Sequence, residues 1–431
     1  MADARKIKPA TALRGEVAIP GDKSLSHRSI MLAGLADTPV RVRNFLASED
    51  CLSTVSCMKA LGVSVELGQE GQVIVQGKGL YGLREPDNVL DAGNSGTTMR
   101  LLSGLLAGQS FFSVLTGDDS LRRRPMARII TPLTQMGARI VGRENSRYAP
   151  IAIESSGSLN GIHYNMPVAS AQVKSAIMFS ALYAGSPTVI TEPYLSRDHT
   201  ERMFAQFGVP VSRDGLTITV DPVSELRAPA VLDIPGDFSS AAFLIVAATI
   251  IPGSEVLLTD VGINPTRTGL LEVLREMGAD IEVLNERLSG EEPVADLIVH
   301  SAALQGISVS SEMIPRLIDE IPILAVAAAF AQGRTSIRGA EELRVKETDR
   351  LKAMACELDR MGGNVIERPD GLIIEGNKRL HFAECQTYSD HRVAMSLAVA
   401  GMASEGVSLN DPGCVCISFP GFFEAMDGCR Q

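Results

Sequence analysis

The sequence predicts an α/β fold built from six copies of one strand-and-helix unit, divided into two halves. Three observations support this prediction. Six polar openings each lead into an apolar run of small residues, glycine-centred segments recur between these runs, and an Ile-Pro-Gly-Asp string occurs twice. Self-similarity at a fixed period is the signature of a repeat architecture. Alternating strands and helices place these repeats in the α/β class.

The six apolar runs are predicted to be buried helices. Their polar openings start 68 to 82 residues apart, at Asp22, Asn94, Ala169, Asp237, Asp319 and Ser389. Ser, Asp or Asn at such a position caps a helix N-terminus. Each opening is therefore expected to begin a helix whose remaining length lies in a core.

Strands are predicted after glycine-centred segments in five of the copies. These segments are LGVSVEL (61–67), MGARIVG (136–142), FGVPVSR (207–213), MGADIEV (277–283) and MGGNVIE (361–367). The glycine suits a helix C-cap, and the alternating apolar residues suit a strand. A second strand follows each, in VIVQG, IAIES, TITVD, LIVHS and LIIEG, so each unit is expected to close with a strand pair.

The two halves are marked by Pro20-Gly21 and Pro235-Gly236, which are turn signals at the same place in the repeat. We expect one domain to comprise residues 1–20 and 236–431, and the other 21–235. The positions of Lys23, Ser24 and Arg28 in the first half are taken by Phe238, Ser239 and Phe243 in the second. The scaffold is thus duplicated, whereas the basic residues are not.

Composition limits the function. The 431 residues carry a net charge of −11 and are 45% hydrophobic, which predicts two ample cores and no general affinity for nucleic acid or an anionic membrane. The seven cysteines show no paired spacing of the kind that binds zinc, and the amino terminus lacks an apolar signal core. We expect a cytoplasmic protein.

Basic residues gather in the helix openings, against the acidic average. They are Lys23, Arg28, Arg100, Lys174 and Arg392. Helix N-termini offer unpaired N–H groups and a positive dipole end. Converging openings would therefore trap an anion.

Other strings admit two interpretations. GDKSLSHR (21–28), GNSGTTMR (93–100), LRRRPM (121–126), SAQVK (170–174), RDHTER (197–202) and LRVKETDR (343–350) suit anion binding, but each also suits an ordinary capped turn or a solvated charged face. Asp319 precedes an apolar helix, where it could cap the helix or, beside bound phosphates, remove a proton.

These strings, in this order, resemble the family of 5-enolpyruvylshikimate-3-phosphate (EPSP) synthases. The resemblance runs from GDKSLSHR to SFPGFF and covers nearly the whole chain. The resemblance implies the enolpyruvyl transferase fold, a two-domain inside-out α/β barrel of six βαβαββ units. It implies transfer of the enolpyruvyl group of phosphoenolpyruvate to the 5-hydroxyl of shikimate 3-phosphate by addition and elimination. Phosphate is released, no metal or organic cofactor takes part, and a monomer is expected.

The resemblance also implies the site residues. Those for shikimate 3-phosphate are Lys23, Ser24, Arg28, Ser170, Gln172, Arg197, Asp319 and Lys346. Those for phosphoenolpyruvate are Lys23, Gly96, Arg124, Gln172, Arg350 and Arg392. Asp319 is implied as the base for the attacking hydroxyl, and Glu347 with Lys23 as the proton donor at the phosphoenolpyruvate methylene.

GDKS, RDHTE, SAQVK and NPTR (264–267) resemble the class II branch of this family. Ile417 stands where class I members carry a lysine, and Gly96 retains the room that glyphosate uses, so partial glyphosate tolerance is expected. Two alternatives remain. A UDP-N-acetylglucosamine enolpyruvyl transferase normally has a reactive cysteine in the loop corresponding to Thr116–Pro125, which has none here. A non-catalytic anion-binding repeat scaffold would not explain basic residues confined to one of two equivalent openings.

Overall fold

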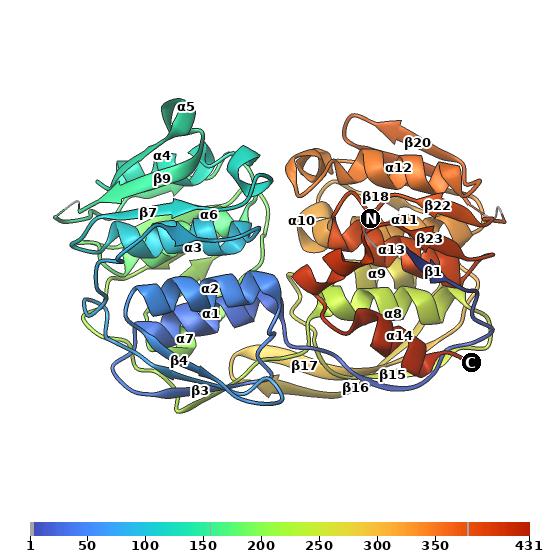
Figure 1. Ribbon diagram of the computed structural model, residues 1–431, viewed down its shortest axis with the longest axis horizontal. Coiled ribbons are helices and arrows are strands. Elements are labelled where there is room, and N and C mark those ends of the chain that lie inside the picture. The colour runs from blue at the N-terminus through green and yellow to red at the C-terminus, as the bar shows by residue number, and fades with distance from the viewer. Residues whose placement is uncertain (1–3, 156, 377–378) are drawn as a thin grey trace. The chain divides into compact units, whose positions relative to one another are not determined.

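The computed structural model describes residues 4–155, 157–376 and 379–431. The chain packs into two compact units (Figure 1). Unit 2 comprises Gly21–Ile234 and Ser289–Glu292. Unit 1 comprises the chain up to Pro20, Pro235–Leu288 and Pro293–Gln431.

Unit 2 contains three four-stranded sheets. In spatial order their strands are β14 (Val231–Asp233), β3 (Val40–Arg43), β5 (Val73–Gln76) and β4 (Ser64–Leu67); β6 (Leu90–Asp91), β7 (Ser113–Thr116), β9 (Tyr148–Glu154) and β8 (Arg139–Gly142); and β10 (His163–Asn165), β11 (Thr188–Thr191), β13 (Thr217–Val220) and β12 (Val211–Asp214). Its helices are α1 (Lys23–Gly34), α2 (Glu49–Ala60), α3 (Gly96–Ala107), α4 (Ala127–Gln135), α5 (Arg143–Ser146), α6 (Ala171–Ala181) and α7 (His199–Gln206), with the 3-10 turn η1 (Leu121–Arg123).

Unit 1 contains two four-stranded sheets and one three-stranded sheet. In spatial order these are β16 (Asp280–Ser289), β17 (Glu292–His300), β15 (Glu255–Gly262) and β2 (Arg14–Ala18); β18 (Ser308–Val309), β19 (Arg334–Ile337), β21 (Gly371–Glu375) and β20 (Val365–Arg368); and β1 (Arg5–Ile7), β23 (Val407–Leu409) and β22 (Ala383–Cys385). Its helices are α8 (Phe238–Ile250), α9 (Gly269–Glu276), α10 (Ile314–Leu317), α11 (Ile321–Phe330), α12 (Arg350–Arg360), α13 (His391–Met402) and α14 (Phe422–Cys429), with the 3-10 turns η2 (Ile318–Glu320), η3 (Glu341–Val345) and η4 (Pro412–Ile417).

One pattern is common to the four-stranded sheets. β10 and β11 are parallel and are joined through α6, and after α7 the chain returns as the antiparallel pair β12 and β13. This is the predicted βαβαββ unit. In the sixth copy the N-terminal β1 pairs with β23, and the chain ends with α14 instead of a strand pair.

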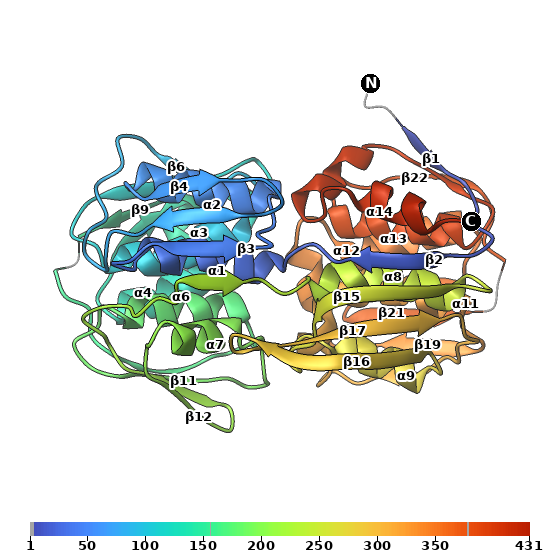
Figure 2. The same ribbon diagram turned by 90° about the horizontal axis from the view of Figure 1, so that it is seen from below.

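The first copies of the two units exchange their leading strands (Figure 2). β2 precedes α1 in the chain but pairs in parallel with β15 of unit 1. β14 precedes α8 but pairs in parallel with β3 of unit 2. The two Pro-Gly pairs follow these strands, so each lies where the chain passes from one unit to the other.

The unit boundaries differ from the sequence prediction in two places. Pro235 packs with unit 1, and residues 289–292 pack with unit 2. These four residues are the tip of the β16–β17 hairpin, where the Ser289 hydroxyl donates to the Asp233 carbonyl over 3.2 Å and Glu292 Oε1 lies 2.8 Å from His199 Nδ1. The alternation of apolar residues predicts that two strands pair, but it does not predict which distant side chains contact the turn between them.

Each unit has its own core. The helices that are buried almost throughout are α1, α3 and α6 in unit 2 and α8, α11 and α13 in unit 1. In unit 2, α3 packs against α6 so closely that a Cβ at Gly104 would stand 2.1 Å from the Ala176 carbonyl oxygen. Small residues along these helices are therefore needed for backbone approach. The helix N-termini, which bear the polar openings, are fixed by this packing.

Candidate active site

The polar openings form helix N-termini, as the sequence predicts. In unit 2, Asp22 caps α1 by accepting from Leu25 N over 2.8 Å, Ser95 caps α3 and Ser170 caps α6. In unit 1, Asp237 caps α8 and Asp390 caps α13. Satisfying these N–H groups holds each first turn, and therefore the basic residues on it, in one conformation.

Asp319 does not cap α11. It lies in η2, and α11 begins after Glu320, where the described part of the chain forms no side-chain cap hydrogen bond. The interpretation of Asp319 as a helix cap is therefore wrong. Its carboxylate instead faces two arginines, Arg350 and Arg392.

The opening of α3 is surrounded by donors within unit 2. Arg100 Nη1 donates to Gln172 Oε1, and Gln172 Nε2 donates to Thr97 Oγ1 over 3.0 Å. Arg124 donates to Asn94 Oδ1 over 2.7 Å. A Cβ built on Gly96 would lie 3.1 Å from Arg100 Nη1 and 3.4 Å from Arg124 Nη1. The structure thus brings Gly96, Arg124 and Gln172 together and adds Arg100.

Arg28 ties the opening of α1 to α6 and α7. Its guanidinium donates to Thr200 Oγ1 and Ser175 Oγ, each over 2.7 Å, and to the Ser24 carbonyl over 2.8 Å. Burial lowers the pKa of Arg28 to about 10 against the effect of Asp22, so the side chain stays cationic at neutral pH. Arg197, in the segment before α7, is near enough to contribute to that lowering.

Lys174 is not available to an anion, contrary to the sequence prediction. Its side chain is fully buried, with Nζ 2.9 Å from Glu192 and 2.8 Å from Glu201. Because two carboxylates already surround this ammonium, its charge is compensated inside unit 2. Lys174 supports α6 from behind and does not belong to its opening.

In unit 1, Arg350 gathers three carboxylates. Its guanidinium lies 2.8 Å from Asp390, 2.6 Å from Glu347 and 3.5 Å from Asp319. Burial lowers the pKa of Arg350, but Asp390, Glu347 and Asp319 outweigh that effect and raise it. The structure therefore places both implied acid–base carboxylates, Asp319 and Glu347, against one permanently charged cation.

Arg392 and Lys346 complete this group. Arg392 Nη1 donates to the Asp319 carbonyl over 2.8 Å, from the first turn of α13. Lys346 follows η3, and burial lowers its pKa against the effect of Asp319 and Glu342. Asp319, Lys346, Glu347, Arg350 and Arg392 thus form one cluster in unit 1.

Arg344, from the same string as Lys346, has a different role. Its Nη1 lies 2.7 Å from Asp349 and 2.8 Å from Glu367, and it donates to two backbone carbonyls of the β20–β21 turn. All of these partners are protein groups. Arg344 therefore braces the segment that carries Lys346 and Glu347.

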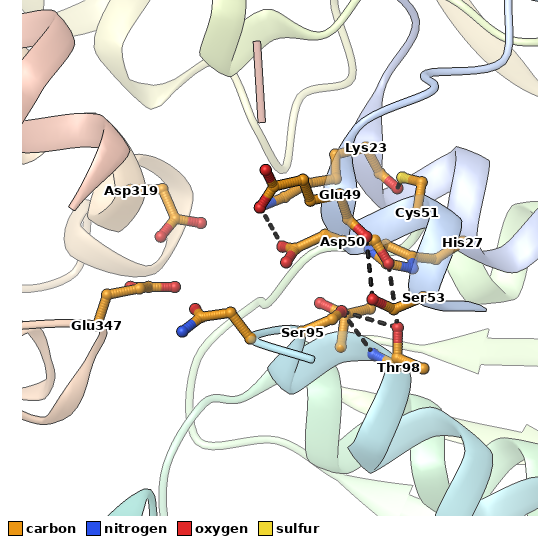
Figure 3. A network of polar contacts seen from close by, with 12 residues as sticks. Lys23, His27, Glu49, Asp50, Cys51, Ser53, Ser95, Thr98, Asp319 and Glu347 are labelled. Atoms are coloured by element: carbon orange, nitrogen blue, oxygen red, sulfur yellow. Dashed lines mark hydrogen bonds and ion pairs between the residues drawn. The ribbon is translucent and has the colours of Figure 1, made fainter. Parts of the chain in front are cut away.

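Sequence reasoning missed Asp50 in unit 2. Its Oδ2 lies 2.9 Å from Lys23 Nζ, and both side chains are largely buried (Figure 3). In the sequence, Asp50 is one of two acidic residues in the first turn of a helix, a position that the helix dipole alone explains. Only the fold pairs it with Lys23.

Within residues 4–155, 157–376 and 379–431, no group of three or more His, Cys, Asp or Glu side chains is arranged to hold a metal ion. All seven cysteines are free. No helix in this part of the chain is long and apolar enough to cross a membrane.

Comparison with known proteins identifies the family. The family model described as EPSP synthase (3-phosphoshikimate 1-carboxyvinyltransferase) matches residues 7–426 of this chain. The chain belongs to the EPSP synthase family. It is 56% identical over 427 residues to the 3-phosphoshikimate 1-carboxyvinyltransferase of Desulforudis audaxviator, covering 99% of each chain, and 52% identical to that of Desulforamulus reducens, covering 97% of this chain and 98% of the relative.

Two solved structures share the fold of this chain. The EPSP synthase of Acinetobacter baumannii has a TM-score of 0.88 at 44% identity, with 99% of this chain and 98% of that chain covered. The enolpyruvyl transferase NikO of Streptomyces tendae has a TM-score of 0.81 at 15% identity, covering 99% and 97%, and shows the shared fold alone. The predicted fold, family and transferase activity are confirmed.

Proposed function

We propose that the clusters described above carry out the 3-phosphoshikimate 1-carboxyvinyltransferase reaction, a step of the shikimate pathway of aromatic amino-acid biosynthesis. The 5-hydroxyl oxygen of shikimate 3-phosphate bonds to C2 of phosphoenolpyruvate while a proton is added at C3. The C2–O bond to phosphate then breaks, C3 loses a proton, and 5-enolpyruvylshikimate 3-phosphate and phosphate are released.

The acid–base groups are assigned first. Asp319 removes the proton of the attacking hydroxyl, and Glu347 with Lys23 delivers a proton to the methylene. General acid–base steps of this kind contribute about 100- to 10,000-fold to a rate. The Arg350 cluster is the observation that carries the proposal, because one buried guanidinium contacts both Asp319 and Glu347.

The substrate-binding groups are assigned from the family resemblance of the sequence. Shikimate 3-phosphate is assigned to Lys23, Ser24, Arg28, Ser170, Gln172, Arg197, Asp319 and Lys346. Phosphoenolpyruvate is assigned to Lys23, Gly96, Arg124, Gln172, Arg350 and Arg392. Two phosphorylated anions repel each other, so several cations are required to hold them in one reactive arrangement.

We place the chain in the class II branch on the strength of its GDKS, RDHTE, SAQVK and NPTR strings and of Ile417. A cytoplasmic monomer that needs no metal or organic cofactor belongs to the same proposal. Light scattering after size exclusion tests the monomer. A chelator titration tests the independence from metals, since turnover should persist with excess EDTA.

The decisive experiment is phosphate release by the purified chain. We expect release only when shikimate 3-phosphate and phosphoenolpyruvate are both present, and none when UDP-N-acetylglucosamine replaces the former. Glu347→Gln should abolish release, whereas Glu341→Gln, at an exposed residue at the start of η3, should not. Release with UDP-N-acetylglucosamine, or full activity of Glu347→Gln, would contradict the assignment.

A further inference from the structure

Asp50 is the direct partner of the lysine that the proposed function places at the reacting methylene. The ion pair joins Asp50 Oδ2 to Lys23 Nζ over 2.9 Å, with 9% of the Asp50 and 16% of the Lys23 side chain exposed. Little water screens this contact, so the two charges interact more strongly than a surface pair. Asp50 therefore restricts where the long, flexible Lys23 side chain can place its ammonium group.

The residue that holds Lys23 is itself anchored. Thr98 Oγ1, on α3, lies 3.4 Å from the Asp50 carbonyl and 2.8 Å from Ser95 Oγ (Figure 3). The same hydroxyl lies 2.7 Å from Thr54 Oγ1. Thr54 Oγ1 in turn lies 2.6 Å from His27 Nδ1 on α1. A series of buried polar groups thus connects the N-terminal halves of α1, α2 and α3.

The side chains that link α3 to α1 in this series, from Ser95 to His27, are uncharged. Burial, together with the neighbouring charges of Lys23 and Arg28, keeps the pKa of His27 well below its ordinary value, so the imidazole is neutral at pH 7. Asp50 is a buried anion in direct contact with the Lys23 ammonium group. Among the described residues, Asp50 Oδ1 is buried without a hydrogen-bond partner, which makes this carboxylate costly to keep.

Anion affinity does not explain a carboxylate at this place. Lys23 is assigned to two anionic substrates, and a negative charge beside it weakens the attraction of either one. Stability is a poor explanation as well, because a buried ion pair gains little over apolar residues of the same shape. The remaining explanation is that the ion pair with Asp50 fixes the direction of the Lys23 ammonium group.

We propose that Asp50 is a positioning residue that orients Lys23 for proton transfer at the phosphoenolpyruvate methylene. This inference rests on the proposed role of Lys23. It adds that the orientation is set before substrate arrives, by an ion pair anchored on the polar chain from Ser95 to His27. Preorganisation of this kind raises the rate of the chemical step and not the affinity.

The test is Asp50→Asn, which keeps the shape of the side chain and removes its charge. We expect kcat to fall about 10- to 100-fold, while the KM for phosphoenolpyruvate stays the same or decreases. The matched control is Glu49→Gln, which makes the same charge change at the preceding, exposed residue of α2 and should leave both constants within about twofold of wild type.

A wild-type kcat, or a raised KM with unchanged kcat, would overturn the proposal. A residue with only a structural role would lower the melting temperature without this split between kcat and KM. If Asp50→Asn does not fold, Asp50→Glu decides. It retains the charge but displaces the carboxylate, so a reduced kcat with unchanged KM supports positioning and a wild-type kcat overturns it.

Lys23→Met separates this inference from the function on which it rests. An inactive Lys23→Met beside a fully active Asp50→Asn would contradict the positioning role alone. A fully active Lys23→Met would contradict the role assigned to Lys23 itself.

Discussion

The openings of α1 and α8 are equivalent in the repeat but differ in what they offer. Each follows Pro-Gly and begins with a capping aspartate, Asp22 in unit 2 and Asp237 in unit 1. Lys23 follows the first cap and remains partly exposed, whereas Phe238 follows the second and is 2% exposed. Both helices are thus capped by an aspartate, but the residues that could meet a ligand differ.

The α8 opening is closed from within unit 1. Arg267, from the NPTR string, places Nη2 2.9 Å from Asp237 Oδ1 and 2.6 Å from Ser239 Oγ. Ser239 in turn donates to Glu320. A helix N-terminus is an anion site only where its cap and first turn are left accessible, and here a protein arginine compensates the cap.

The two units also differ in what their buried arginines meet. Arg28 of unit 2 donates to hydroxyls and a carbonyl, whereas Arg350 of unit 1 meets three carboxylates. The first arrangement suits the binding of an anion. The second suits the transfer of protons, because it holds candidate bases in a fixed, charge-compensated group.

The largest effect is expected at that carboxylate group. Asp319→Asn should leave shikimate 3-phosphate binding nearly intact and lower kcat by about 100- to 10,000-fold, since it removes the base but keeps the shape. Calorimetry and steady-state kinetics measure the two quantities. Glu312→Gln, at an exposed residue of the preceding segment, is the control. Near wild-type turnover of Asp319→Asn would return Asp319 to a structural role.

The closed opening of α8 should matter for stability and not for catalysis. Arg267→Met leaves the buried Asp237 without this compensating cation, at a cost of about 3–5 kcal/mol in the free energy of unfolding. Urea titration measures this loss, and the kcat of the folded fraction should be unchanged. The control Arg287→Met breaks an exposed pair with Asp260 and should cost at most about 1 kcal/mol. Equal losses in the two variants would remove the distinction.

The α3 opening in unit 2 should discriminate between anions of different length. Ala at position 96 brings a methyl group to 3.1 Å from Arg100 Nη1, so the arginine must move slightly and the room beside Gly96 shrinks. We expect Gly96→Ala to raise the ratio of the glyphosate inhibition constant to the KM of phosphoenolpyruvate by about 10-fold. Inhibition kinetics on both proteins give this ratio. A ratio that does not rise rejects the steric argument.

The last effect, on the pH dependence of stability, is expected at His27 in α1. Because burial depresses its pKa in the folded state, the unfolded chain binds the extra proton as the pH falls below 6.5. The stability present above pH 6.5 is therefore lost on acidification, by up to about 1.4 kcal/mol per pH unit. His27→Gln should flatten the dependence of the melting temperature on pH between about 5 and 6.5. An unchanged slope would show that other groups control this range.

Much of the fold could be predicted because its signals are local. Capping residues, small-residue helices and glycine-centred helix ends recur in order, and each depends on neighbours within a few positions. The α11 opening could not be predicted in this way. The same short polar string is compatible with a helix cap and with a 3-10 turn that directs Asp319 toward arginines. Only the packing of α13 and α12 places Arg392 and Arg350 against Asp319.

The sequence by itself therefore determined the six repeats, the positions of most helix N-termini and the residue types assigned to two phosphorylated substrates. Tertiary structure alone decided which cations are compensated. Lys174 and Arg267 bear the same charge as Arg28, yet carboxylates contact the first two, whereas Arg28 donates to hydroxyls and a carbonyl. It also paired Lys23 with Asp50, 27 positions further along the chain. Charge is a property of a residue, whereas its neutralisation depends on partners that only folding brings within contact distance.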